Sequence, residues 1–252
     1  MWLSRFNSLK NTMVLNQKVG CENLYKERFN NEMSFQKIAD MEKRIIEIKK
    51  KLDENLRNRS YSEENILLMN ERDTLQREVS LLKGEETAIP IKTSYPLDVG
   101  APCPHVISNG YKTYLIYYIG TGNSNWNETE VDVKIIDSKS DDFVALVSFN
   151  WCYSFRFGGI NDEVLNGHPL YEHGLEAYEM HLIENSSWIK DQQKINSVHT
   201  NFSQKRWNQR KHYIFTFHDD IFECIANDYK IQVFKGSLKD TALLANKMLF
   251  DD

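Results

Sequence analysis

A chain of 252 residues, with 41% hydrophobic and 27% charged residues, has the composition of a globular protein and is long enough to bury a core. No apolar run approaches the roughly 18 residues that a transmembrane helix requires, which excludes an ordinary spanning segment. The net charge of −5 is uneven: residues 1–83 carry 16 Lys and Arg against 13 Asp and Glu, and residues 84–252 carry 15 against 23. The second part therefore repels nucleic acid overall, although a local basic patch can reverse this.

Cysteine usage and the first residues indicate the compartment. The four cysteines are widely spaced and include no CxxC pair. The N-terminus lacks the continuous apolar core of a secretory signal. We therefore expect buried thiols in a reducing environment, and a cytoplasmic protein.

Residues 1–30 form a separate N-terminal segment. The spacing of Trp2, Phe6, Leu9 and Met13 predicts a short amphipathic helix with these side chains on one face. Because basic residues are few in it, we expect this helix to dock on protein rather than on a membrane surface.

Residues 31–83 are predicted to form a helical arm. Positions 33–83 contain neither Gly nor Pro, and apolar residues follow a heptad spacing whose phase changes near residue 60, which predicts two helices at about 35–57 and 62–83. The arm either folds into a packed hairpin or forms a coiled coil, which self-associates through residues 35–83 or binds a protein partner. The residues assigned to self-association are Ile38, Met41, Ile45, Ile48, Leu52, Leu68, Leu75 and Leu82.

Residues 84–104 are predicted to be a linker and residues 105–252 an α+β body. The linker begins with Gly84 at a helix C-cap position and is rich in proline. Runs of strands come first and helices come late, which predicts a mostly antiparallel, aromatic-rich sheet rather than alternating βαβ units. The expected strands are 111–119, 131–136, 143–157, 177–184, 212–218 and 229–235, and the expected helices are 186–198, 202–211 and 237–249.

The run at 143–157 is about twice the length of an ordinary strand, so we expect a bend within it. Its odd-numbered positions are mostly aromatic, from Phe143 to Phe157. This stripe is interpreted as core packed against the late helices, which makes Trp151 a core residue. Cys152 and Cys224 lie in apolar strands and are interpreted as buried thiols rather than nucleophiles.

Two clusters of acidic and imidazole residues are candidate sites, at 161–173 and 218–223. His supplies a base or a neutral ligand near pH 7, and carboxylates hold a divalent ion or orient the imidazole. No HExxH, GxSxG or Walker motif is present, and the alternative is a hydrogen-bonded network that only stabilises loops. The ligand-binding candidates are Asn161, Asp162, His168, Tyr171 and Glu223. The catalytic candidates are Glu163, His168, His218 and Asp219. A divalent metal, if present, would be held by Asp162, His168, His218 and Asp219.

A third feature is a basic patch in the expected helix 202–211. Cationic side chains beside an indole can grip phosphates and stack a base. The alternative is a solvated helix face with the indole packed inward, and in a body of net charge −8 nucleic-acid binding is not favoured. The patch consists of Lys205, Arg206, Trp207, Arg210 and Lys211.

The sequence as a whole favours an oligomerising interaction or sensor protein, whose body binds a ligand or protein partner through loops 158–174 and 218–223. The alternative is a metal-assisted hydrolase or nuclease that uses the two clusters. The third hypothesis is nucleic-acid binding through Lys205–Lys211. The cofactor is undetermined, and whether the protein is an enzyme stays open.

Overall fold

The computed structural model describes residues 34–58, 62–120 and 142–250. The expected helix at residues 1–30 and the expected strand at 131–136 lie outside these ranges. The chain divides into two compact units, residues 1–82 and 83–252. Within the described ranges no helix has the length and apolar character needed to cross a membrane.

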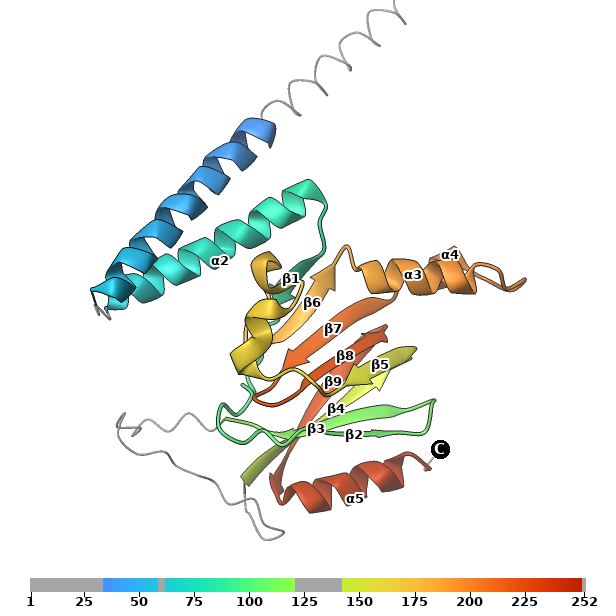
Figure 1. Cartoon of the computed structure of the whole chain (residues 1–252). Helices are drawn as coiled ribbons and strands as arrows, with labels where there is room; N and C mark the ends of the chain where they lie inside the picture. The colour runs from blue at the N-terminus through green and yellow to red at the C-terminus, as the bar shows by residue number, and fades with distance from the viewer. Residues whose placement is uncertain (1–33, 59–61, 121–141, 251–252) are drawn as a thin grey trace, which may run out of the picture. The chain divides into compact units, whose positions relative to one another are not determined.

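The first unit contains two antiparallel helices, over residues 34–57 and at α2 (Glu63–Lys83) (Figure 1). Three ion pairs join them at seven-residue steps on each helix, a spacing that keeps the same two faces opposed along the pair. Exposed ion pairs of this kind add little to the stability of a helix pair, so they show how the two helices are aligned rather than what holds them together. The pairs are Lys37–Glu78 at 2.6 Å, Arg44–Glu71 at 2.7 Å, and Lys51–Glu64.

The heptad residues predicted for self-association are mostly covered within a single chain. Met41, Ile48 and Leu68 are buried, Ile48 to 1% exposure. Ile38, Ile45, Leu52 and Leu75 are half-buried, and Leu82 is exposed. The arm is thus a helical hairpin, and its self-association stays a prediction.

The body contains two antiparallel sheets (Figure 1). The strands are β1 (Thr87–Pro90), β2 (His105–Ser108), β3 (Thr113–Tyr118), β4 (Asp142–Asn150), β5 (Ser154–Phe157), β6 (Met180–Glu184), β7 (Lys211–Thr216), β8 (Ile221–Ala226) and β9 (Asp228–Gly236). One sheet has the order β1-β6-β7-β8-β5 and the other β2-β3-β4-β9. The α+β class and the antiparallel pairing predicted from the sequence are confirmed, although β1, β2 and β8 were not predicted. β1 lies inside the segment expected to be a linker.

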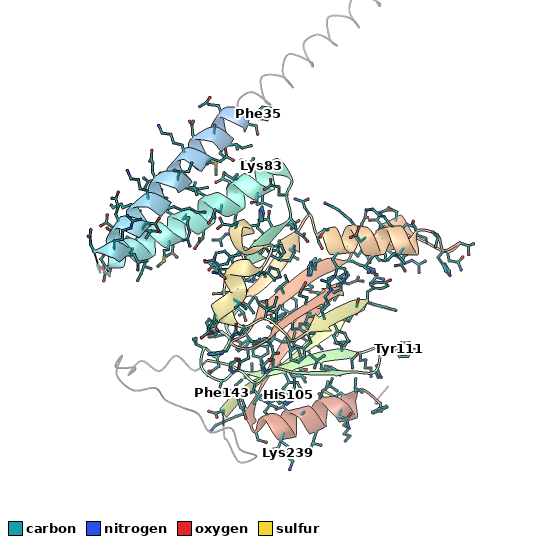
Figure 2. The ribbon with its side chains drawn as sticks, viewed as in Figure 1. Phe35, Lys83, His105, Tyr111, Phe143 and Lys239 are labelled. Atoms are coloured by element: carbon teal, nitrogen blue, oxygen red, sulfur yellow. The ribbon has the colours of Figure 1, made fainter. Side chains whose placement is uncertain are left out.

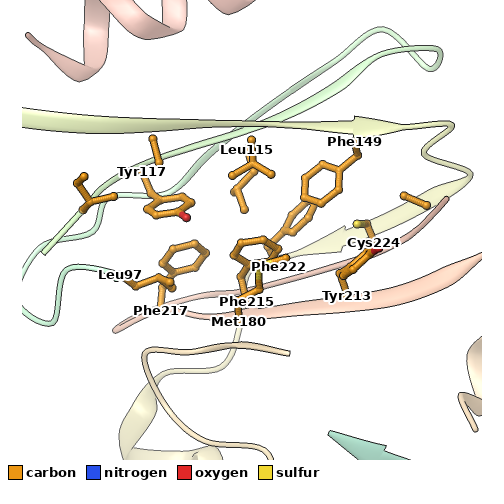
Figure 3. Packing of buried hydrophobic residues seen from close by; sticks show 14 residues of the cluster. Leu97, Leu115, Tyr117, Phe149, Met180, Tyr213, Phe215, Phe217, Phe222 and Cys224 are labelled. Carbon is orange, nitrogen blue, oxygen red and sulfur yellow. The ribbon is translucent and has the colours of Figure 1, made fainter. Parts of the chain in front are cut away.

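The main core lies between the two sheets, where aromatic side chains from both meet (Figure 3). Phe149 of β4 lies 5.3 Å from Phe222 of β8, measured between ring centroids, and 6.0 Å from Phe215 of β7 in an edge-on arrangement. Rings in such offset or edge-on contacts add about 0.5–1.5 kcal/mol beyond the area they bury. The aromatic content of the body therefore goes mainly into joining sheet to sheet.

Helices and loops cover the outer faces. Helix α5 (Leu238–Met248) packs on β3 and β4 through Leu238 and Ala245. The 3-10 helices η1 (Asp162–Gly167) and η2 (Tyr171–His173) bring Leu165 and Leu170 onto the outer face of the other sheet. Since both of its faces are covered, β3 is buried at every position.

The interpretation of residues 143–157 as one stripe packed on late helices is wrong. The expected bend is present, because β4 ends at Asn150 and β5 pairs with β8 in the other sheet. The odd positions of β4 face the other sheet, and α5 contacts the even positions. Trp151 lies in the turn with φ +53° and is 73% exposed.

We therefore expect Trp151→Ala to change the free energy of unfolding by less than about 0.5 kcal/mol, as at an ordinary surface position. Phe222→Ala should lower the free energy of unfolding by about 3–5 kcal/mol, because it opens a cavity among the core rings. Urea denaturation of both variants provides the measurement. Equal losses for the two would mean that the Trp151 ring packs in the core.

Candidate ligand-binding cleft

The cluster at 218–223 begins in a hairpin turn that joins β7 to β8. Phe217 N donates to the carbonyl oxygen of Asp220 at 2.9 Å, and His218 Nδ1 lies 3.0 Å from Oδ1 of Asp219. The hydrogen bond to Asp219 and the carboxylates around the ring raise the pKa of His218, in spite of partial desolvation. The charged form of this imidazole is therefore stabilised relative to that of a free histidine.

The turn is bonded to the start of η1. Asp162 N donates to the carbonyl oxygen of His218 at 2.9 Å, and Asp162 Oδ2 accepts a hydrogen bond from the Tyr178 hydroxyl. That hydrogen bond and the charge of His218 lower the pKa of Asp162, while burial and Asp162 raise the pKa of Tyr178 to about 12. The structure thus brings together Asp162, Glu163, His218 and Asp219. His218 is bonded to Asp219 and Asp162 Oδ2 to Tyr178, whereas the buried Oδ1 of Asp162 has no hydrogen-bond partner.

The remaining residues of the 161–173 cluster do not join this corner. His168 is partly buried, and its Nδ1 accepts a hydrogen bond from Leu170 N at 3.1 Å. Burial lowers the pKa of His168. Asn161 precedes η1 without a side-chain cap bond, and Tyr171 opens η2 with an exposed ring. Across the described ranges, no three His, Cys, Asp or Glu side chains are grouped to hold a metal ion.

Glu223 belongs to a different network, on β8. His212 of β7 is buried; its Nε2 lies 3.1 Å from Oε2 of Glu223, and its Nδ1 lies 2.9 Å from Oγ of Ser186. Ser186 Oγ also accepts from Ile189 N at 3.2 Å, which caps helix α3 (Ser187–Asn196). The serine is buried and already serves as a cap, so this Ser–His–Glu chain fastens α3 to the sheet instead of presenting a nucleophile.

The charge of this network is balanced locally. Burial alone would raise the pKa of Glu223, but the His212 hydrogen bond and the positive charge of Arg156 bring it below its usual value. The Arg156 guanidinium lies 4.0 Å from the ring centroid of Trp188 on α3. Each polar group here has a partner, and the network has the properties of a structural element.

The basic patch divides into an outer and an inner part. Helix α4 spans only Gln204–Trp207, shorter than predicted, and exposes Lys205 and Arg206 while Trp207 is buried. Lys211 starts β7 with an exposed side chain. Arg210 lies between two rings, with its guanidinium 4.5 Å from the centroid of Tyr153 and 4.7 Å from that of Trp207.

Trp151 and Arg210 both line each of two cavities. The first has a volume of about 780 Å³, and the second about 500 Å³. They lie at the end of the body where the β2–β3 turn carries Tyr111, away from the end of β4 marked by Phe143 (Figure 2). We define the Trp151–Arg210 cleft as these two cavities. Other residues lining the first are Tyr111, Lys112, Cys152, Tyr153, Tyr229 and Lys230. Other residues lining the second are Asn196, Asn201, Phe202, Arg206, Trp207 and Asn227.

The cleft is basic in an acidic body. Its lining includes four cations, Lys112, Arg206, Arg210 and Lys230, and one carboxylate, Asp228. Among the described residues no carboxylate forms an ion pair with Arg210, and burial lowers the pKa of this guanidinium, although it remains charged. Its buried Nε has no hydrogen-bond partner, and neither has the buried Nε1 of Trp207. Because both of these atoms are buried, a ligand in the cleft would contact the Arg210 guanidinium through its remaining nitrogens.

Cys152 lies on the wall of the first cavity. A hydrogen bond with Cys224 lowers its pKa to about 7 against the effect of burial, and Thr113, the Ser154 backbone and the nearby Arg210 act in the same direction. Cys224 is fully buried with a raised pKa, as expected of a structural thiol. Cys152 is only partly buried, so the interpretation of both cysteines as inert core thiols holds for Cys224 alone.

The sequence did not assign Trp151, Cys152 and Tyr153 to a site, because they continue an aromatic run. The signal that marks them is the length of that run, since a strand of 15 residues must break, and the break exposes its side chains.

Comparison of the chain with protein-family models, with curated proteins and with solved structures finds no match in any of the three.

The lowered pKa of Cys152 predicts that this thiol is alkylated at a lower pH than an ordinary cysteine. Its rate of reaction with iodoacetamide should rise with a midpoint near pH 7, because the thiolate is the reacting form. Cys103 is an internal control: burial and nearby carboxylates raise its pKa, so it should react only at higher pH. Peptide mass spectrometry follows both sites, and a common midpoint for the two would contradict the assignment.

Proposed function

We propose that this protein is a recognition protein whose body binds an anionic ligand in the Trp151–Arg210 cleft. The observation that carries the proposal is the state of Arg210: a partly desolvated guanidinium, placed between two rings, with no carboxylate partner among the described residues and an unpaired Nε. Desolvating a charge without pairing it is destabilising, so such a group is best explained by a ligand that pairs it. Arg is also well suited to planar, bidentate recognition of phosphate or carboxylate.

The other candidate sites support binding less well. In loops 158–174 and 218–223, Asp162 is bonded to Tyr178 and His218 to Asp219, which leaves the buried Oδ1 of Asp162 as the unpartnered atom there. The hydrolase or nuclease alternative needs a ligand set for a metal, and none is grouped among the residues described. We also place the protein in the cytoplasm, where a reducing environment would keep Cys103, Cys152 and Cys224 as thiols.

The test uses a short inorganic polyphosphate as the probe and Trp fluorescence as the signal, because Trp151 and Trp207 line the cleft. Arg210→Gln should weaken binding by about tenfold or more, the effect of losing a charge-assisted hydrogen bond. Lys205→Gln is the matched control, since Lys205 is exposed on α4 and lines neither cavity; it should change the affinity less than about twofold. Equal effects, or no binding of the probe, would contradict the proposal.

The arm is proposed to assemble the protein through its outer side chains. Ile46, Ile66 and Leu67 are each more than half exposed on the hairpin, whereas the predicted seam residue Ile48 is already covered. Contact between copies would bury the exposed aliphatic groups, and full burial of each side chain would stabilise the assembly by about 1.5–3 kcal/mol. Two copies of the cleft in one particle would then strengthen weak binding by multivalency.

We expect Ile46→Asp with Leu67→Asp to yield a smaller particle with unchanged helix content, measured by light scattering and circular dichroism. Ile48→Asp should instead reduce the helix content, because it places a charge inside the hairpin. The conservative pair Ile46→Leu and Leu67→Ile serves as control and should keep the mass of the wild type. An unchanged mass for the Asp pair would exclude assembly through these side chains.

A further inference from the structure

We infer that the anionic ligand of the Trp151–Arg210 cleft is single-stranded nucleic acid, with a base stacked on Trp151 and a neighbouring phosphate on Arg210. This inference rests on the proposed anion-binding function and adds the class of ligand. It also differs from binding through the outer face of α4, because the contacts come from the two cavities and not from Lys205 or Lys211.

The first argument is the state of Trp151. Its indole is 73% exposed, and its backbone has φ +53°, the left-handed region that costs an ordinary residue about 1–3 kcal/mol. A large ring held out to solvent on a strained turn contributes nothing to the core. It does provide a flat face on the wall shared by both cavities, which is what a stacking platform requires.

The second argument is that rings and cations line the first cavity together. Tyr111 is 88% exposed at its rim, and Tyr229 and Lys230 line the same cavity as Trp151, although they project from opposite faces of β9. Lys112 also lines it, with its Nζ bonded to the carbonyl oxygen of Met248 at 2.9 Å. Proteins that hold single strands combine bases stacked on aromatic rings with phosphates on Lys and Arg.

The third argument is the amide content of the walls. The cavity linings include Asn150, Asn201, Gln209 and Asn227. Side-chain amides carry both donors and acceptors and can pair with the exposed edges of unpaired bases. A small inorganic anion would pair with the cations of the cleft but would leave most of these rings and amides without a contact.

Size and charge favour a strand over a free nucleotide or a duplex. Each cavity falls within the range of about 300–1,000 Å³ typical of small-ligand sites, and the two share a wall, so together they accommodate consecutive nucleotides. A duplex keeps its bases stacked inside and presents a continuous charged surface to a body of net charge −8. A single strand offers its bases to Trp151 and needs only the basic cleft.

The test measures fluorescence anisotropy with labelled oligonucleotides of about 12 nucleotides, the scale of single-strand sites. The probes are a uridine strand, a thymidine strand, an abasic strand with the same phosphodiester backbone, a duplex, and a mononucleotide as competitor. The wild type should bind at least one base-containing strand about tenfold or more tightly than the abasic strand, because stacking adds to the phosphate contacts. It should bind the duplex and the mononucleotide more weakly than that strand.

Two variants separate the base from the phosphate. Trp151→Ala should bring the affinity for the base-containing strand down to that for the abasic strand, and Trp151→Phe should restore most of the difference, since a ring returns. Arg210→Gln should weaken binding of both strands and reduce the slope of log K against log salt by about 0.7, the release of counterions at one phosphate. Thermal melting confirms that each variant is folded, and Trp151 is exposed enough for its loss to leave the fold intact.

The outcomes distinguish this inference from the anion-binding proposal. Equal affinity for abasic and base-containing strands, or for duplex and single strand, would overturn the inference while leaving anion binding in place. Binding of the mononucleotide as tightly as the strand would make a free nucleotide the ligand and would also overturn it. Absence of binding to every polyanion, polyphosphate included, would overturn both.

Discussion

The body depends on the burial of aromatic side chains between two sheets, where the largest of its hydrophobic clusters lies. Phe149 of one sheet meets Phe215 and Phe222 of the other, and each buried ring contributes on the order of 2 kcal/mol. Sheets packed face to face lie about 10 Å apart, which leaves room for one interdigitated layer of side chains. Helix α5 and the 3-10 segments are then placed on the outer faces, since the inner faces are fully used.

The same packing determines where the cleft forms. The chain passes from one sheet to the other twice at this end of the body, after Asn150 and again at Asn227, and Asn227 N donates to the carbonyl oxygen of Asn150 at 2.9 Å. A strand that changes sheets cannot keep all its side chains in the core. Trp151 leaves the core at the first crossing, Cys152 stays at its edge, and Asp228 follows the second crossing; all three line the first cavity.

The sequence predicted the local elements of this chain better than their tertiary environment. The two arm helices, α3, α5 and most strands follow from periodicity and from the placement of Gly and Pro, which act over a few residues. Hydrophobic alternation along the sequence does not show that both faces of β3 and β4 are covered. A strand buried on both sides has no polar face, so its residues do not alternate. The sequence singled out Glu223 and His168 but not what surrounds them: Glu223 is bonded to His212 across the β7–β8 hairpin, and His168 Nδ1 accepts from Leu170 N.

Two polar groups of the body show how a binding function can be separated from a structural one. His212 is buried, but both ring nitrogens have partners, and its neighbours Ser186 and Glu223 hold an element of the fold in place. Arg210 is less buried, but its Nε has no partner, and its charge is not neutralised by any carboxylate among the described residues. Folding selects for the first arrangement, because every donor is satisfied within the chain. The second is destabilising for the free protein, as is the left-handed backbone of Trp151 beside it. Such departures concentrate at functional sites. Two of them border the same pair of cavities, and two others, the left-handed backbone of Tyr178 and the unpaired Oδ1 of Asp162, meet beside the β7–β8 turn.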